Sequence, residues 1–195
     1  MSFSLVAGLG NPGRDYAKSR HNLGWVVIDA FVAKLGLSWK TQSQFEAEVA
    51  RWDRPGHRTC HFAKPLTFMN DSGRAIGALA RFYKLEPAQI AVIHDDLTID
   101  LGLIKVSVTG SAGGHNGVAS LLEHLGDGFA RYRLGIGPKQ PPEMDLADFV
   151  LGKFSPAQNQ IITQQFDRIL AGLDLLLHRG AETAMNQLNR RDTAQ

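Results

Sequence analysis

One histidine, one aspartate and several asparagines stand where acid–base chemistry could be done. His21 lies at the entrance of an apolar helical pattern, and Asp95 follows the strongly apolar stretch 90–93. A histidine paired with a carboxylate is a sufficient general base, because the carboxylate fixes the tautomer and stabilises the imidazolium. Asparagine side chains can orient a water molecule or stabilise an oxyanion. The pattern is compatible with base-assisted hydrolysis, but the residues alone favour the simpler interpretation that His21 with Asn22 forms a helix N-cap and that Asp95 caps a turn.

Other familiar catalytic patterns are absent from the sequence. It has no G-x-S-x-G elbow, no P-loop lysine motif and no H-E-x-x-H. The single cysteine, Cys60, shares a predicted strand face with Phe62, so we expect a small core residue and not a nucleophile. The histidines are scattered singly, whereas metal ligands cluster. We therefore expect neither a metal nor a cofactor.

The segment 8–13 reads Gly-Leu-Gly-Asn-Pro-Gly and matches the dinucleotide-binding fingerprint literally. That fingerprint needs its third glycine inside a helix packed on the strand, with an acidic residue about 20 positions further on. Here the charged run 14–20 follows, and no apolar stripe begins before Leu23. We expect an open turn that exposes Asn11 and brings His21 back beside the strand end. A nucleotide-binding enzyme remains the alternative, which a thermal-shift assay with NAD or ATP would reveal.

Hydrophobic periodicity predicts alternating strands and helices. The two most apolar strands, 4–8 and 90–94, are typical of a sheet that is buried on both faces. Polar residues collect after the strand ends, where sites form in such sheets. We predict an α/β fold in one domain, 1–195, with a mixed twisted β-sheet flanked by helices on both faces. The expected strands are 4–8, 45–52, 58–64, 90–94, 102–108 and 131–136, and the expected helices are 25–36, 76–83, 118–125 and a long terminal helix from 156 that includes the arginines at 179, 190 and 191.

Length and composition describe an ordinary globular chain. Its 195 residues fit one domain, and 44% hydrophobic with 21% charged residues is enough for a sizeable core. The formal charge of +2 excludes a uniformly basic surface, so any nucleic-acid contact must be local. One cysteine, no signal-peptide pattern and no stretch of 18 apolar residues predict a cytoplasmic protein that does not span a membrane. Without a long exposed apolar stripe, we expect a monomer.

Several stretches of the sequence, taken together, are specific for one protein family. In order and with sensible spacing they resemble the bacterial peptidyl-tRNA hydrolases, esterases that recycle tRNA from prematurely released peptidyl-tRNA. The weaker matches are GIG at 135–137 and FVLGKF at 149–154. The main ones are GLGNPGRDYAKSRHN at 8–22, KPLTFMNDSG at 64–73, IHDDL at 93–97 and GSAGGHNG at 110–117.

The resemblance implies a metal-free esterase. His21 would be the general base on a water molecule, and Asp95 would orient it. An ester has a better leaving group than an amide, so a positioned water, a base and oxyanion donors suffice without a covalent intermediate. A non-catalytic RNA-binding relative is an alternative, but the intact candidate residues argue against it. The residues similar to those that the family uses for substrate and water are Asn11, Tyr16, Met69, Asn70 and Asn116.

Basic residues near the glycine-rich loop are similar to a clamp that the family places on the tRNA 5′-phosphate. They are Lys105, Arg131 and Arg133, on predicted adjacent strands, with solvated strand faces as the alternative. This sequence has Ser107 where a second basic residue is expected, so the clamp would be thinner. The loop at 138–147 is a candidate lid.

Two further features have mainly structural expectations. His115, before a helix start in the glycine-rich loop, is expected to pack the loop and not to act as a second base. Arg179, Arg190 and Arg191 near the end of the chain are candidate tRNA contacts, with a solvated helix face as the alternative.

Overall fold

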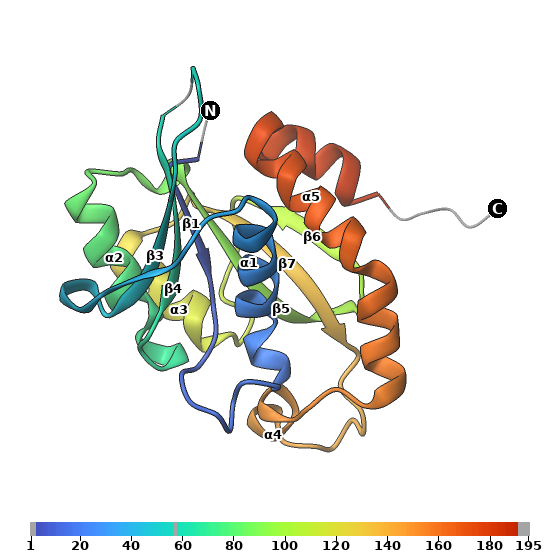
Figure 1. Cartoon of the computed structure of the whole chain (residues 1–195). Coiled ribbons are helices and arrows are strands. Elements are labelled where there is room, and N and C mark those ends of the chain that lie inside the picture. The colour runs from blue at the N-terminus through green and yellow to red at the C-terminus, as the bar shows by residue number, and fades with distance from the viewer. Residues whose placement is uncertain (1–2, 57, 191–195) are drawn as a thin grey trace.

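A single mixed sheet runs through the computed structural model, which describes residues 3–56 and 58–190 (Figure 1). Its seven strands lie in the order β2-β3-β4-β1-β5-β7-β6. The central strands β4, β1, β5 and β7 are parallel, while β2, β3 and β6 pair antiparallel with their neighbours. The strands are β1 Leu5–Gly8, β2 Lys40–Gln42, β3 Ala47–Trp52, β4 Cys60–Pro65, β5 Ile90–Asp100, β6 Ile104–Ser107 and β7 Ala130–Gly137.

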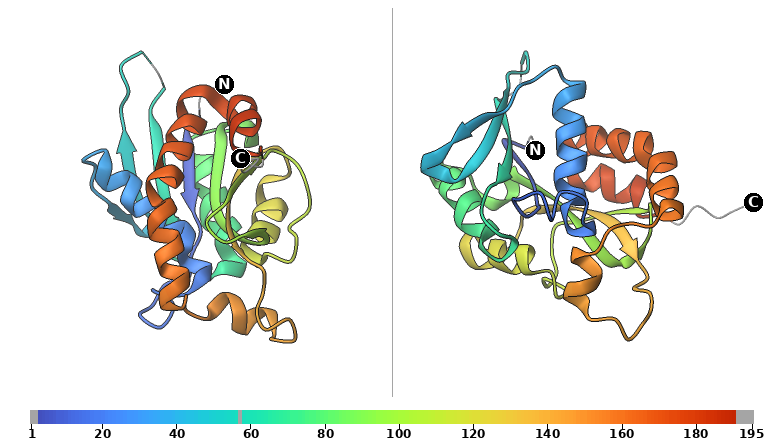
Figure 2. Two further views of the ribbon diagram at one scale, coloured as in Figure 1. Left: turned by 90° about the vertical axis from the view of Figure 1, so that its right-hand side faces the viewer. Right: turned by 60° about the horizontal axis from the view of Figure 1, so that its bottom comes forward.

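Helices cover both faces of this sheet, so the predicted fold class is confirmed (Figures 1 and 2). Successive side chains of a strand point to opposite faces. Val6 and Ile93 therefore pack with α1 and α5, whereas Leu5 and Val92 pack with α2 and α3. Within the described ranges, no helix is long and apolar enough to cross a membrane. The helices are α1 Leu23–Lys34, α2 Ser72–Phe82, α3 Asn116–Leu125, α4 Leu146–Leu151 and α5 Pro156–Leu188.

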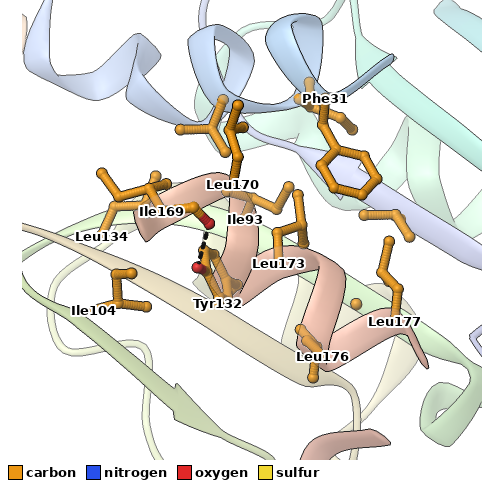
Figure 3. Packing of buried hydrophobic residues seen from close by; sticks show 14 of the residues in the cluster. Phe31, Ile93, Ile104, Tyr132, Leu134, Ile169, Leu170, Leu173, Leu176 and Leu177 are labelled. Carbon is orange, nitrogen blue, oxygen red and sulfur yellow. Dashed lines mark hydrogen bonds between the residues drawn. The ribbon is translucent and has the colours of Figure 1, made fainter. Parts of the chain in front are cut away.

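The long helix α5 is fastened to the sheet at two places. Tyr132 of β7 is fully buried, and its hydroxyl donates to the carbonyl of Ile169 over 2.6 Å (Figure 3). Gly180 interrupts the helix with φ 80° and ψ 171°, a conformation that glycine adopts readily. Just after the helix ends, Asn189 Oδ1 accepts from the N–H of Val106 in β6 over 2.7 Å, and its Nδ2 donates to the Val106 carbonyl over 2.8 Å.

Several element boundaries differ from the predicted ones. β2 was missed because its three residues are all polar. β5 continues beyond residue 94, since its later residues still pair with β7 across an irregularity between Asp96 and Asp100. α4 follows the predicted loop and is too short to show a helical period. α5 ends at Leu188, so Arg179 lies on this helix as predicted, whereas Arg190 follows its end. Arg191, one of the candidate tRNA contacts, lies outside the described residues.

Gly172 of α5 makes the contact with Tyr132 possible. A β-carbon at Gly172 would overlap the Tyr132 hydroxyl, which is itself held by its hydrogen bond. We expect Gly172→Ala to lower the free energy of unfolding by about 1–3 kcal/mol, despite the better helix propensity of alanine. Urea unfolding measures this. Thr163→Ala, at an exposed site of the same helix, is the control and should change little; equal midpoints for the two variants would contradict the packing argument.

Candidate active site

A cleft of about 740 Å³ opens beyond the carboxyl ends of the parallel strands. On the α2/α3 side of the sheet, β6 and β7 carry polar residues where the central strands carry apolar ones. Lys105 pairs with Arg133, and Ser107 pairs with Arg131, so the four side chains share this face. Residues of this face line the cleft together with the glycine-rich loop and α4.

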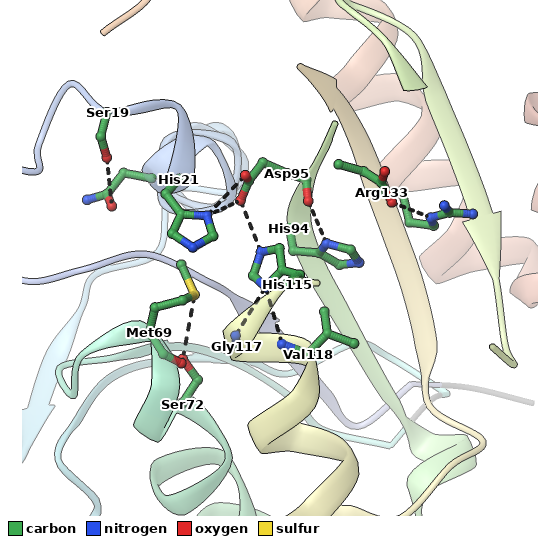
Figure 4. A network of polar contacts seen from close by, with 12 residues as sticks. Ser19, His21, Met69, Ser72, His94, Asp95, His115, Gly117, Val118 and Arg133 are labelled. Atoms are coloured by element: carbon green, nitrogen blue, oxygen red, sulfur yellow. Dashed lines mark hydrogen bonds and ion pairs between the residues drawn. The ribbon is translucent and has the colours of Figure 1, made fainter. Parts of the chain in front are cut away.

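His21 and Asp95 both line the cleft, and their side chains meet there. Figure 4 shows this contact. His21 Nδ1 lies 2.9 Å from Asp95 Oδ1 and 3.0 Å from Oδ2. Both residues are buried, at 6% and 2% exposed. An ionised carboxylate only accepts hydrogen bonds, so Nδ1 carries the hydrogen and Nε2 is left with its lone pair. The pair predicted from the sequence is therefore in hydrogen-bonding contact, with the geometry that a general base requires.

The turn before α1 holds His21 in place through its neighbour Asn22. Asn22 does occupy the N-cap position of α1, as the simpler interpretation expected, but within the described chain its side chain makes no capping bond to the helix. Its Oδ1 instead accepts from the N–H of Asn11 over 2.8 Å, and its Nδ2 donates to the Asn11 carbonyl over 2.9 Å. The segment after β1 is thus an open turn, and the next α-helix begins only at Leu23, but Asn11 is buried within it and not exposed as predicted. The context of a dinucleotide fingerprint is missing, as the sequence indicated.

His115 is a second partner of Asp95, which the sequence reasoning missed. Its Nε2 lies 3.1 Å from Asp95 Oδ1, while its Nδ1 accepts from the N–H groups of Gly117 and Val118 at the start of α3. His115 does order the loop, as expected, but it also joins the loop to the carboxylate. The only signal in the sequence for this second role was the position of His115 in the loop shortly before the predicted helix 118–125.

The environment keeps Asp95 ionised. Burial alone would raise its pKa, but the field and hydrogen bond of His115, together with the hydrogen bond of His21, outweigh burial. These groups hold the pKa of Asp95 well below its usual range. A charged carboxylate in this position favours the protonated form of an adjacent imidazole, which is the form that arises when His21 takes up a proton.

The same three residues are the one group in the described chain whose geometry could be compared with a metal site. His21, Asp95 and His115 offer ligand atoms within 4.8 Å of one another. A histidine ligand binds a metal through a nitrogen lone pair. His115 Nδ1 accepts two backbone N–H groups, so Nε2 must keep its hydrogen and has no lone pair to offer. The donor set therefore does not fit a metal without breaking the start of α3.

The predicted substrate-binding residues converge on the cleft from separate elements. Asn11 Oδ1 accepts from the N–H of Met69 over 2.7 Å, which leaves its Nδ2 for another partner. Tyr16 lies edge-on to Phe68, with 6.3 Å between the ring centroids. The predicted residues that line the cleft are Asn11, Tyr16, His21, Met69, Asn70, Asp95, Asn116, Arg131 and Arg133.

The predicted phosphate clamp is only partly assembled. Arg133 lines the cleft, and its Nε bonds Asp96 Oδ2 over 2.8 Å. Lys105 is exposed on the adjoining strand and does not line the cleft. Arg131 is buried and is already engaged, because it donates to the Ser111 carbonyl over 2.8 Å and pairs with Asp127 at 3.3 Å. Arg131 also lines the cleft, but these bonds tie its guanidinium to the glycine-rich loop.

Helix α4 contributes an apolar wall that was not predicted. Leu146, Val150 and Leu151 line the cleft. Arg20, next to His21, donates to the carbonyl of Phe149 in α4 over 3.0 Å. The helix that borders the cleft is therefore bonded to the same turn that carries His21.

Comparison with known proteins identifies the family. The family model described as peptidyl-tRNA hydrolase matches residues 5–195. The peptidyl-tRNA hydrolase of Mycobacterium tuberculosis is 45% identical over 95% of this chain and 96% of its own length, and that of Lactiplantibacillus plantarum is 43% identical over 95% and 99%. The crystal structure of peptidyl-tRNA hydrolase from Acinetobacter baumannii superposes with a TM-score of 0.89 at 34% identity, covering 98% of this chain and 97% of that one. The chain therefore belongs to the peptidyl-tRNA hydrolase family and is a hydrolase.

Proposed function

We propose that this enzyme hydrolyses the ester bond of peptidyl-tRNA, with His21 as the general base and Asp95 as the residue that orients it. The observation that carries this proposal is the contact of His21 Nδ1 with both oxygens of a buried, ionised carboxylate. That contact leaves Nε2 as a proton acceptor on a residue that lines the cleft. The products are free tRNA and peptide, so the reaction returns tRNA to translation; we propose that a monomer does this in the cytoplasm.

The reaction follows from this arrangement in two proton transfers. His21 Nε2 takes a proton from a water molecule, whose oxygen attacks the ester carbonyl carbon. The tetrahedral intermediate then loses the ribose oxygen, which receives the proton from the imidazolium. A positioned base contributes about 10²–10⁴-fold, and one oxyanion donor about 10²–10³-fold. Together they can accelerate cleavage of an ester without a covalent intermediate.

The asparagines supply the uncharged donors. The Asn11 backbone is fixed by Asn22 and its Oδ1 by Met69, so its Nδ2 has a defined position in the cleft. Asn70 and Asn116 are exposed at the cleft from the starts of α2 and α3. We assign these amides to the substrate carbonyl and the attacking water. Met69 and Tyr16 then border the peptide side.

Arg133 is the residue that we assign to the RNA phosphate, with Lys105 as a weaker neighbour. Asp96 and Thr98 bond Arg133 through Nε and Nη2, which fixes the guanidinium and leaves Nη1 for a ligand. Ser107, rather than a cation, completes this face. The grip on RNA is therefore concentrated on one arginine.

Replacing the base should abolish the chemistry but not the binding. We expect His21→Ala to lower tRNA release from N-acetyl-aminoacyl-tRNA by at least about 10²-fold, with EDTA present, while tRNA binding is largely kept. His178→Ala is the matched control, since His178 also contacts an aspartate, Asp174, but is exposed far along α5. Full hydrolysis by a folded His21→Ala variant, or loss of binding together with activity, would contradict the assigned role.

The orienting carboxylate should act through its charge as well as its position. Asp95 stays ionised at neutral pH because its pKa is held well below the usual range, and its charge stabilises the imidazolium that forms in the reaction. Asp95→Asn should therefore lower kcat/KM on N-acetyl-aminoacyl-tRNA at neutral pH, because the neutral amide cannot stabilise that charge. Asp174→Asn, which changes a partly exposed carboxylate beside His178, serves as the control; an unchanged kcat/KM in a folded Asp95→Asn variant would contradict the role assigned to Asp95.

Because one arginine makes most of the proposed contact with RNA phosphate, its loss should affect KM and not kcat. Arg133→Gln should raise KM several-fold with little change in kcat, and should reduce the slope of log KM against log salt by about one. Lys40→Gln, which removes an exposed cation from β2 at the opposite edge of the sheet, is the control. If both variants show the wild-type salt slope, Arg133 does not contact phosphate.

A further inference from the structure

His94 lines the cleft but has no part in the mechanism described above. It precedes Asp95 on β5, is only 3% exposed, and packs its ring edge-to-face with that of His115 at 4.8 Å. Strand alternation points His94 to the α2/α3 side, where the polar face of β7 and β6 continues.

The hydrogen bond of one ring nitrogen fixes the state of the other. His94 Nδ1 lies 2.8 Å from the backbone carbonyl of Asp95, which can only accept, so Nδ1 carries the hydrogen. Nε2 is then a bare acceptor, and it has no hydrogen-bond partner among residues 3–56 and 58–190. Burial, together with His115, lowers the pKa of His94 to about 3, so the ring remains neutral at physiological pH.

An acceptor of this kind is costly in a folded protein unless a ligand or water satisfies it. Nε2 is covered by neighbouring side chains, so a donor reaches it only after these side chains shift. A donor that arrives there gains a hydrogen bond without breaking one that Nε2 already makes with the described residues. His94 is thus prepared to recognise one N–H or O–H group.

The position of His94 indicates which part of the substrate supplies that group. His94 pairs with Arg133 on β7, and Arg133 pairs with Lys105 on β6, so the three side chains form a row across the sheet. Figure 4 shows His94 between the His21–Asp95 pair and Arg133. Met69 follows β4, which lies on the other side of β1. His94 therefore lies between the site of ester cleavage and the basic side chains, on the RNA side.

We propose that His94 Nε2 accepts a hydrogen bond from the terminal adenosine of the tRNA and so positions the scissile ester against His21. This inference rests on the proposed function. Two groups of that nucleoside have the required chemistry, the ribose 2′-hydroxyl beside the ester and the exocyclic amine of the base. His94 is a positioning and specificity residue, since it transfers no proton.

Two variants separate the two ring nitrogens. His94→Asn keeps an amide N–H near the position of Nδ1, where it can still donate to the Asp95 carbonyl, but removes the acceptor. His94→Gln places an amide oxygen near the position of Nε2. We expect His94→Asn to lower kcat/KM roughly three- to tenfold on N-acetyl-aminoacyl-tRNA, as for one lost neutral hydrogen bond, and His94→Gln to restore part of it.

Modified substrates then identify the donor. The same assay uses N-acetyl-aminoacyl-tRNA that ends in adenosine, in 2′-deoxyadenosine or in purine riboside, which lacks the amine. With the substrate that lacks the true donor, the wild type should fall to the level of His94→Asn, and the variant should show no further loss. An equal loss for His94→Asn on all three substrates, or no loss on any, overturns the proposal.

Two measurements keep the test decisive. Urea unfolding shows whether His94→Asn is folded; if it is not, the wild-type rates on the three substrates decide alone. The ¹⁵N shift of His94 Nε2 should move when tRNA that ends in adenosine binds, and should not move with tRNA that lacks the donor. A wild type that hydrolyses none of the substrates refutes the proposed function, whereas normal hydrolysis with an unmoved Nε2 signal refutes only the role of His94.

Discussion

The buried carboxylate of Asp95 sets the constraint that the rest of the site satisfies. An ionised group out of contact with water is tolerated only when hydrogen-bond donors surround it. His21 supplies one donor from the turn before α1, and His115 supplies the other from the start of α3. The backbone carbonyl of the same residue receives a third hydrogen bond, from His94. Three histidines therefore have their orientation fixed by one residue at the end of the parallel part of β5.

These donors keep their positions only if the segments that carry them are fixed. Side chains that form hydrogen bonds with backbone groups fix these segments. Asn22 takes both backbone groups of Asn11, Arg131 holds the glycine-rich loop through Ser111, and Arg20 joins the His21 turn to α4. Each bond satisfies a polar group in a segment without regular secondary structure. The site therefore combines loops, which can carry varied side chains, with contacts that limit their movement.

Local sequence patterns were enough to predict the structural features that depend on residues close together in the chain. The apolar runs of β1 and β5 predicted a sheet that is buried on both faces, and the polar residues after them predicted where the site lies. The contact between His21 and Asp95 was predicted from the family resemblance and from this clustering of polar residues. The role of His115 required knowing that α3 begins beside β5, a distance of 20 residues along the chain that no periodicity reports. Burial of Arg131 was equally hidden, because a basic residue in an alternating strand is typical of a solvated face.

The bond between Asn189 and Val106 has a consequence for how molecules of this protein behave toward one another. β6 is the outermost strand of its side of the sheet, and an outer strand presents unpaired N–H and C=O groups that can accept a strand from another molecule. Asn189 occupies both groups of Val106, within a strand of four residues. The residue that follows α5 thus takes the place that a foreign strand would need, and it protects this edge against aggregation.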